Sequence, residues 1–201
     1  MTARHICLWL ACAAAVTAAA LAQTATETVI LAFEDFPQGA NPYAPLFRNP
    51  QGTLYGTTYL GGRMNLGVVF EVGPAGYKLM YSFKGGSDGA HPYAGVIQVS
   101  AGNLYGTTYQ GGAANAGVVY KVTPMGQESV LYSFTGGSDG GGPYAGLIAD
   151  AAGNLYGTTY GGGNTNCTGG CGVVYKVTPA GQETVLHSFT GGTDGANPYA
   201  G

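Results

Sequence analysis

The protein has 201 residues and few charges: 8% of its residues are charged, against roughly 25% in an ordinary soluble domain. The formal net charge is −3 and the sequence contains no cluster of Lys or Arg, which argues against a nucleic-acid or anionic-membrane partner. Glycine accounts for 37 residues, too many for a helical protein, whereas apolar residues make up 45% and suffice for a core. The glycines are therefore interpreted as turns between strands rather than as disorder.

The first 22 residues have the three parts of a secretory signal peptide. One Arg in "MTARH" precedes the uncharged run "ICLWLACAAAVTAAALA", and Ala20 and Ala22 form a small-x-small cleavage site. We expect cleavage after Ala22 and a mature protein that is secreted, periplasmic or at the cell surface, without a membrane span. An uncleaved anchor is disfavoured by the Ala-rich run, and a lipoprotein modified at Cys12 by the short apolar stretch before it.

Removal of the leader takes Cys7 and Cys12 with it and leaves Cys167 and Cys171. An even number of Cys in an exported protein favours a disulfide. The alternative is a metal site, but two Cys without a nearby His or a second Cys pair supply only half of one. We therefore predict a disulfide that stiffens a glycine-rich loop, and no metal or cofactor.

The chain repeats itself with a period of about 50 residues, which is typical of a propeller, a solenoid or an array. Three phrases recur in order: "PYAG" or a variant of it at Pro42, Pro92, Pro143 and Pro198; "LYGTTY" at Leu54, Leu104 and Leu155; and "GVVF" or "GVVY" at Gly67, Gly117 and Gly172.

Each repeat contains four predicted strands, rich in aromatic and β-branched residues. In the third repeat they are "GLIAD" from Gly146, "NLYGTTY" from Asn154, "GVVYKVT" from Gly172 and "ETVLHSF" from Glu183. Short Pro- and Gly-containing turns join antiparallel neighbours, and four strands per 40 to 50 residues fit a propeller blade. We predict an all-β fold of four-stranded antiparallel units arranged as β-propeller blades; a solenoid would instead pair strands of different repeats in parallel.

Neither face of these strands is plainly polar, as expected of sheets that are buried on both sides. One glycine lies in the middle of each second strand, where it would allow a neighbouring group to approach closely. These glycines are Gly56, Gly106 and Gly157.

The phase of the repeats sets the expected domain boundaries. The segment "ETVILAF" from Glu27 matches the fourth strand "ETVLHSF" and is predicted to be the leading strand of an incomplete blade. Three blades are fewer than the 4 to 8 of known propellers, so we expect an incomplete propeller whose parent chain continues beyond Gly201 or which assembles with other chains. The expected segments are the signal peptide (1–22), the leading strand with its inter-blade loop (23–43), three blades (44–83, 84–134 and 135–189) and the start of a further repeat (190–201).

The repeated phrases "GNLYGTTYQGGAANAGVVYKVTP" and "CGVVYKVTPAGQETVLHSF" resemble the bacterial tandem repeat called GloVer, found in exported "choice-of-anchor" proteins. The resemblance covers nearly all of residues 27–201. It implies a secreted or surface-attached repeat protein, and it provides no established enzymatic activity to carry over to this chain. No C-terminal anchoring segment is recognised, which again favours a parent chain that is longer.

The inter-blade loops and the loops between the second and third strands are expected at the same end of each blade. Asp88, Asp139 and Asp194 occupy equivalent places in the inter-blade loops, with Asn65 and Asn115 on the neighbouring loops. Such carboxylates bind calcium or face a sugar when several converge. The alternative, which we favour, is that each Asp precedes a Gly and bonds to nearby backbone amides of its own turn.

An aromatic residue follows each repeated Pro, namely Tyr43, Tyr93, Tyr144 and Tyr199. The last three are candidates for stacking on sugar rings or on a surface polymer, together with the three aspartates. The alternative is that each Tyr packs under its loop as a spacer between blades.

No catalytic residue is predicted. His91 and His187 are not equivalent, no Ser lies in a nucleophile elbow, and Glu128 and Glu183 are expected as exposed edge residues away from the Asp loops. We therefore expect a non-catalytic binding or structural module at the cell surface. The alternative is a fragment of a propeller hydrolase or lyase that acts on polysaccharide or lactone.

Overall fold

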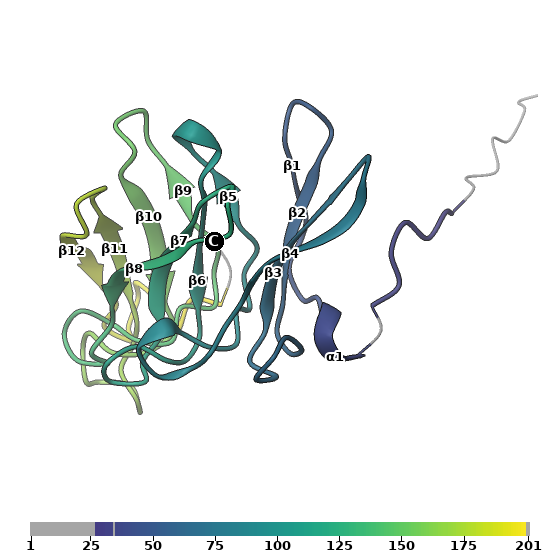
Figure 1. Cartoon of the computed structure of the whole chain (residues 1–201). Helices are drawn as coiled ribbons and strands as arrows, with labels where there is room; N and C mark the ends of the chain where they lie inside the picture. Colours follow the sequence, from purple (N-terminus) through teal and green to yellow (C-terminus); the bar gives the residue numbers. More distant parts are fainter. Residues whose placement is uncertain (1–26, 34, 200–201) are drawn as a thin grey trace, which may run out of the picture. The chain divides into compact units, whose positions relative to one another are not determined.

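The computed structural model describes residues 27–33 and 35–199 (Figure 1). The predicted signal peptide lies outside the described residues. The residues from Leu31 onward form one compact unit. No helix in the described part of the chain is long and apolar enough to cross a membrane.

This unit contains three four-stranded antiparallel sheets, each built from consecutive strands. The first sheet comprises β1 (Phe47–Arg48), β2 (Leu54–Thr58), β3 (Val68–Gly73) and β4 (Gly76–Ser82). The second comprises β5 (Ile97–Gln98), β6 (Leu104–Thr108), β7 (Val118–Val122) and β8 (Glu128–Ser133). The third comprises β9 (Ile148–Ala149), β10 (Leu155–Thr159), β11 (Val173–Val177) and β12 (Glu183–Ser188). Three short helices lie between strands or before them: α1 (Asp35–Gln38), η1 (Gly86–Asp88) and η2 (Ser100–Gly102).

The three sheets share one register. The repeated Leu of the second strand faces a Val of the third strand in each sheet, as in the pair Leu104↔Val122. Each third strand also has a β-bulge at the same place, between Val119 and Tyr120 in the second sheet. A bulge increases local twist, which turns the fourth strand relative to the others.

Consecutive sheets pack face to face through apolar side chains. Val69 and Met80 of the first sheet share a buried cluster with Leu104 and Tyr120 of the second. A second cluster joins Val119 of the second sheet to side chains of the third, which are Leu155, Val173, Tyr175 and Val177. The middle sheet is therefore buried on both faces, and the predicted all-β architecture of propeller-type blades is confirmed.

The mid-strand glycines permit a close approach, but the neighbour belongs to the same sheet. Gly106 pairs with Tyr120 across the sheet, and a Cβ on Gly106 would lie 2.5 Å from the Tyr120 hydroxyl oxygen. Gly157 has the same relation to Tyr175. The glycine thus leaves room for the tyrosine ring of the neighbouring strand in the same sheet. That ring fills the space between the two blades.

The predicted leading strand is wrong. Residues 27–33 form no strand, and Val29 and Ile30 are 72% and 71% exposed. Phe33 instead packs edge-on against Phe70 of the first sheet, with ring centroids 5.1 Å apart. A fourth strand needs a third strand beside it, and among the described residues none pairs with this segment, whose Phe33 covers the first sheet without strand pairing.

Candidate binding site and loop face

The inter-blade loops and the loops between second and third strands lie together, as expected. Ala90 of the first inter-blade loop forms a β-bridge with Gln110 of the second sheet's loop, and the His91 N–H donates to Leu66 O at 2.8 Å. The next loop repeats both contacts, through Gly141 with Gly161 and through the Gly142 N–H with Ala116 O, so each of these two loops is bonded to the blades on both sides.

The three repeated aspartates close their own loops. Each carboxylate accepts a hydrogen bond from the main-chain N–H four residues earlier, at 2.7 Å for Asp88, 2.8 Å for Asp139 and 3.1 Å for Asp194. Each also accepts from a side chain seven residues earlier, as Asp139 does from the Tyr132 hydroxyl at 2.8 Å. These contacts are those of the turn interpretation, and a binding role for the aspartates stays a prediction.

The neighbouring asparagines act in the same way. Asn65 Oδ1 accepts from the Gly61 N–H at 2.8 Å, and Asn115 Oδ1 from the Gly111 N–H at 2.9 Å. Within residues 27–33 and 35–199, no three His, Cys, Asp or Glu side chains are placed to hold one metal ion.

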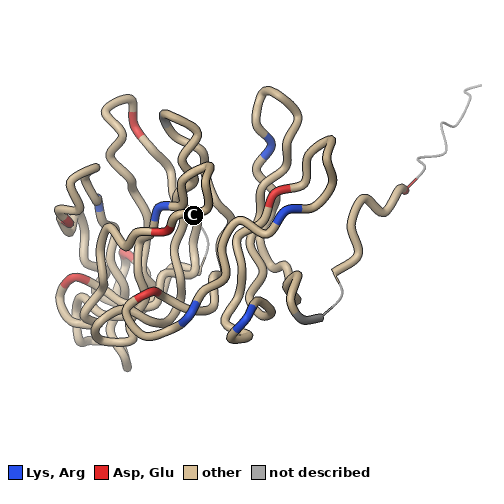
Figure 2. Tube along the Cα trace, viewed as in Figure 1, with Lys and Arg blue, Asp and Glu red and all other residues tan. Residues whose placement is uncertain are grey.

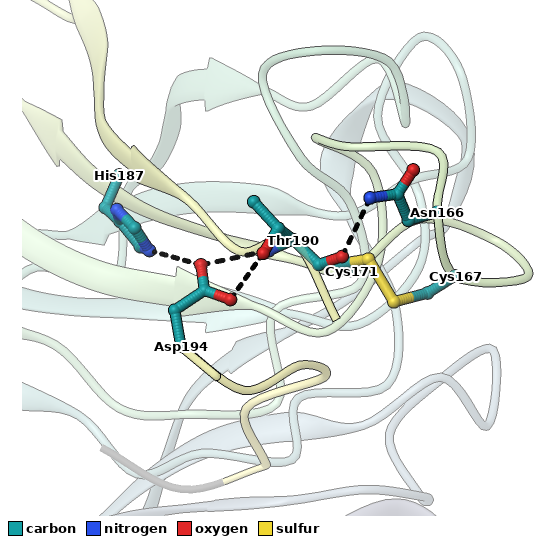
Figure 3. Close-up of polar contacts among 6 residues, drawn as sticks. All are labelled: Asn166, Cys167, Cys171, His187, Thr190 and Asp194. Atoms are coloured by element: carbon teal, nitrogen blue, oxygen red, sulfur yellow. Dashed lines mark hydrogen bonds and ion pairs between the residues drawn. A yellow bond between two sulfur atoms is a disulfide. The ribbon is translucent and has the colours of Figure 1, made fainter. Parts of the chain in front are cut away.

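The last inter-blade loop differs from the others, as Figure 3 shows. His187 stands where the earlier repeats have Tyr, and its Nε2 lies 3.2 Å from Asp194 Oδ2. The Thr190 hydroxyl donates to Asp194 Oδ1 at 2.5 Å. Hydrogen bonds from Thr190 and His187 hold the pKa of the Asp194 carboxyl below its ordinary value.

The predicted disulfide is present and braces this loop. Cys167 and Cys171 are bonded, with their Cα atoms 5.0 Å apart (Figure 3). The Asn166 side-chain amide donates to Thr190 O at 3.0 Å, and the Asn197 N–H donates to Cys171 O at 2.7 Å. The insertion therefore ties the third blade to the loop that follows it, a contact that the sequence did not reveal.

Removing the disulfide is expected to have a modest effect. Because the bridge closes a very short loop, replacing both Cys167 and Cys171 by Ser should lower the free energy of unfolding by about 2 kcal/mol. Chemical denaturation of the double variant beside the wild type measures this. A loss above about 4 kcal/mol would contradict a local brace and indicate that the loop supports the whole blade.

The repeated tyrosines form a continuous ladder across the blades. Tyr43 stacks on Tyr93 with ring centroids 5.3 Å apart, Tyr93 contacts Tyr144 at 4.7 Å, and Tyr144 stacks on Tyr199 at 4.5 Å. We call these four residues the tyrosine ladder. Their rings touch from blade to blade, as the spacer interpretation predicted.

A second row of tyrosines supports the ladder and was missed by the sequence reasoning. Each is the last residue of a "LYGTTY" phrase and contacts two ladder rings; Tyr109, for example, lies 5.8 Å from Tyr93 and 4.5 Å from Tyr144. The other members are Tyr59 and Tyr160. Their recurrence with the period of the ladder was the available signal.

The ladder lines a cavity of about 460 Å³, together with the small residues that follow each Tyr, and its lining contains no charged side chain. The end residues Tyr43 and Tyr199 are 58% and 62% exposed. Burial and hydrogen bonds with Tyr109 and Tyr199 raise the pKa of Tyr144, and burial raises that of Tyr93. The hydroxyls of Tyr93 and Tyr144 are therefore neutral donors and acceptors in an aromatic site without charged side chains.

The expectation that Glu128 and Glu183 are exposed edge residues is wrong. Both are half-buried, and one carboxyl oxygen of each is buried without a hydrogen-bond partner. The twist brings the turn before β8 against the preceding blade, where a Cβ on Gly126 would lie 2.6 Å from Met80 O. Burial and then Asp88 raise the pKa of Glu128 to about 8.

The three tandem sheets, the bonded inter-blade loops and the repeated aromatic contacts define an all-β protein built from propeller-type blades. The chain belongs to the Gloeobacter/Verrucomicrobia repeat family, whose model matches residues 16–201. No curated protein matches the sequence. Among solved structures, the chain is similar to an X-ray structure described as that of a gluconolactonase, with 21% identity, a TM-score of 0.46, and coverage of 77% of this chain and 51% of that one. The chain thus spans about half the length of that protein.

Proposed function

We propose that the protein is an exported, non-catalytic module that binds an uncharged carbohydrate or similar surface polymer through the tyrosine ladder. The observation that carries this proposal is the aromatic cavity without charge, built from equivalent residues of consecutive repeats. Tyrosine rings suit sugars, because they offer an apolar face and a hydroxyl group to a ligand that itself presents apolar faces and hydroxyl groups.

The charge distribution agrees with a neutral ligand. In the described part of the chain, Figure 2 shows Lys and Arg mainly on the first blade and Asp and Glu mainly on the two blades that follow. The lining of the ladder cavity carries neither sign, so it offers no ion pair to an anionic polymer.

The two exposed ends of the ladder provide the mutational test. Tyr199→Ala is expected to weaken polysaccharide binding about tenfold, because one aromatic contact contributes about 0.5–1.5 kcal/mol beyond its buried area. Tyr43→Ala should act in the same direction. Titration calorimetry against the best ligand of a glycan screen measures the change.

The matched control is Tyr156→Ala, which removes a tyrosine outside the ladder and should leave binding unchanged. No binding to any neutral glycan, or an equal loss in the control, would contradict the ladder as a site. Bond cleavage in the bound polymer would contradict a non-catalytic role. Export is checked by N-terminal sequencing of the mature protein, which should begin at Gln23.

We also propose that a further blade covers the outer face of the third sheet. On the second sheet this face carries Ile97 and Val119, which pack against the third sheet. The equivalent Ile148 and Val174 line an apolar pocket of about 270 Å³. The encoded sequence downstream tests this: a further repeat is expected there, and a monomeric natural product without one would contradict the proposal.

A further inference from the structure

Pairs of carboxyl groups join consecutive blades in two equivalent places. Asp88 lies in η1, between the first and second blades, and Glu128 begins β8 of the second blade. Asp139 and Glu183 hold the same two positions at the next junction. Each pair thus links an inter-blade loop to the fourth strand of the following blade.

The aspartate of each pair already accepts hydrogen bonds from a tyrosine hydroxyl and a main-chain N–H of the preceding blade and loop. Asp88 accepts from the Tyr81 hydroxyl at 2.5 Å and from the Lys84 N–H at 2.7 Å. On the other side stands the glutamate, of which one carboxyl oxygen is buried without a hydrogen-bond partner, at Glu128 and at Glu183 alike. Ionising a half-buried carboxyl that lacks a donor and lies beside a second carboxylate is unfavourable, so the glutamate is expected to keep its proton.

The first blade shows that the two positions are neighbours even where no carboxyl occupies them. Gln38 stands at the place of Asp88, and Tyr77 at the place of Glu128. The Tyr77 hydroxyl donates a hydrogen bond to Gln38 O. At this place in the first blade neither carboxyl is present, whereas at the two junctions between described blades both are.

We propose that Glu128 and Glu183 each keep a proton in the folded protein, beside Asp88 and Asp139, and so make the two blade junctions pH-dependent. In the acidic range this proton allows the two half-buried carboxyl groups of each pair to lie near each other. In the alkaline range both ionise, repel each other, and weaken the junction.

The groups around each pair favour the protonated state. Glu128 faces Asp88, the Tyr81 and Tyr120 hydroxyls, and Lys84, of which only Lys84 lowers its pKa. Burial and Asp88 outweigh that cation.

At the second junction Thr135 stands in the place of Lys84, so no cation opposes the carboxyl pair. Glu183 faces Asp139 and the hydroxyls of Tyr132 and Tyr175. Burial and then Asp139 raise the pKa of Glu183.

The sign of the pH effect follows from these shifts. The pKa of Glu128 rises from 4.5 to about 8 on folding. The stabilisation is therefore complete below pH about 4.5, declines as the pH rises through 8, and is absent above it.

Thermal unfolding of the full chain between pH 5 and pH 9 tests the proposal. The wild-type Tm is expected to fall by roughly 5 °C over this range relative to the double variant Glu128→Gln, Glu183→Gln. Glutamine keeps the donor that the proton supplies, so the double variant should be the more stable protein at pH 9. Glu71→Gln is the matched control, because Glu71 lies on the outer hairpin beside Lys78, and it should keep the wild-type pH profile.

Parallel Tm profiles of wild type and double variant would overturn the proposal. A rise of Tm with CaCl₂ without a fall at alkaline pH would also overturn it, in favour of a cation at the pair. If the double variant does not fold, carboxyl NMR of the wild type decides: titration of Glu128 near pH 8 supports the retained proton, and titration near pH 4.5 refutes it.

Discussion

Replacing Phe134 by Ala is expected to lower the free energy of unfolding by about 4 kcal/mol, as large-to-small changes in a fully packed core do. Phe134 is completely buried, and its ring meets Tyr175 of the third blade edge-on, with centroids 4.9 Å apart. Phe83 and Tyr120 repeat this contact at the first junction, at 5.1 Å. Loss of the ring would leave a cavity between two blades rather than within one.

Urea unfolding of the variant measures this loss. Phe134→Leu should recover much of the lost stability, because it refills the cavity with apolar volume. Met125→Ala serves as the surface control, since Met125 is 88% exposed, and its effect should stay within about 0.5 kcal/mol. A cost for Phe134→Ala as small as that of the control would mean that the blades do not depend on this contact.

The second large effect is expected at Gly111, in the loop between β6 and β7. Gly111 has φ +85°, and a Cβ there would lie 2.4 Å from the Cα of Gly89 in the inter-blade loop. Gly111→Ala should therefore cost about 3–4 kcal/mol, of which 1–2 kcal/mol is backbone strain and the remainder the displacement of a rigid backbone neighbour. Equilibrium denaturation measures it.

Gly86→Ala separates the two causes of that cost. Gly86 also has a positive φ, +59°, but a Cβ there meets nothing within 4 Å. It should lose only the strain, about 1–2 kcal/mol. Equal losses at Gly86 and Gly111 would show that the close contact between the two loops contributes nothing.

The fold could be predicted largely from the sequence because the same pattern of strands and turns occurs in three repeats. Each strand, its antiparallel neighbour and each Pro- or Gly-containing turn recur with one spacing, so that errors in any one copy are corrected by the others. The leading segment "ETVILAF" matches the sequence of a fourth strand, but it forms no strand. A fourth strand pairs with a third strand, and a match in sequence does not provide that neighbour.

The candidate site was only partly predictable. The ladder residues were found by their position after each Pro, but the supporting row that includes Tyr109 was counted as strand. The burial of Glu128 was not predicted because it depends on the twist and bulge of β7, which bring the start of β8 toward the preceding blade. The alternation of residues in the sequence does not reveal this twist. The contact between the disulfide loop and the following loop was not predicted either, because Asn166 and Thr190 are distant in sequence.

The central claim is that each repeat folds into its own antiparallel sheet and that consecutive sheets meet through aromatic side chains. A nuclear Overhauser spectrum of the aromatic region tests it most directly. Cross-peaks between the rings of Phe83 and Tyr120, and between those of Phe134 and Tyr175, are predicted. Their absence, with backbone cross-peaks of parallel strands between different repeats instead, would contradict the account.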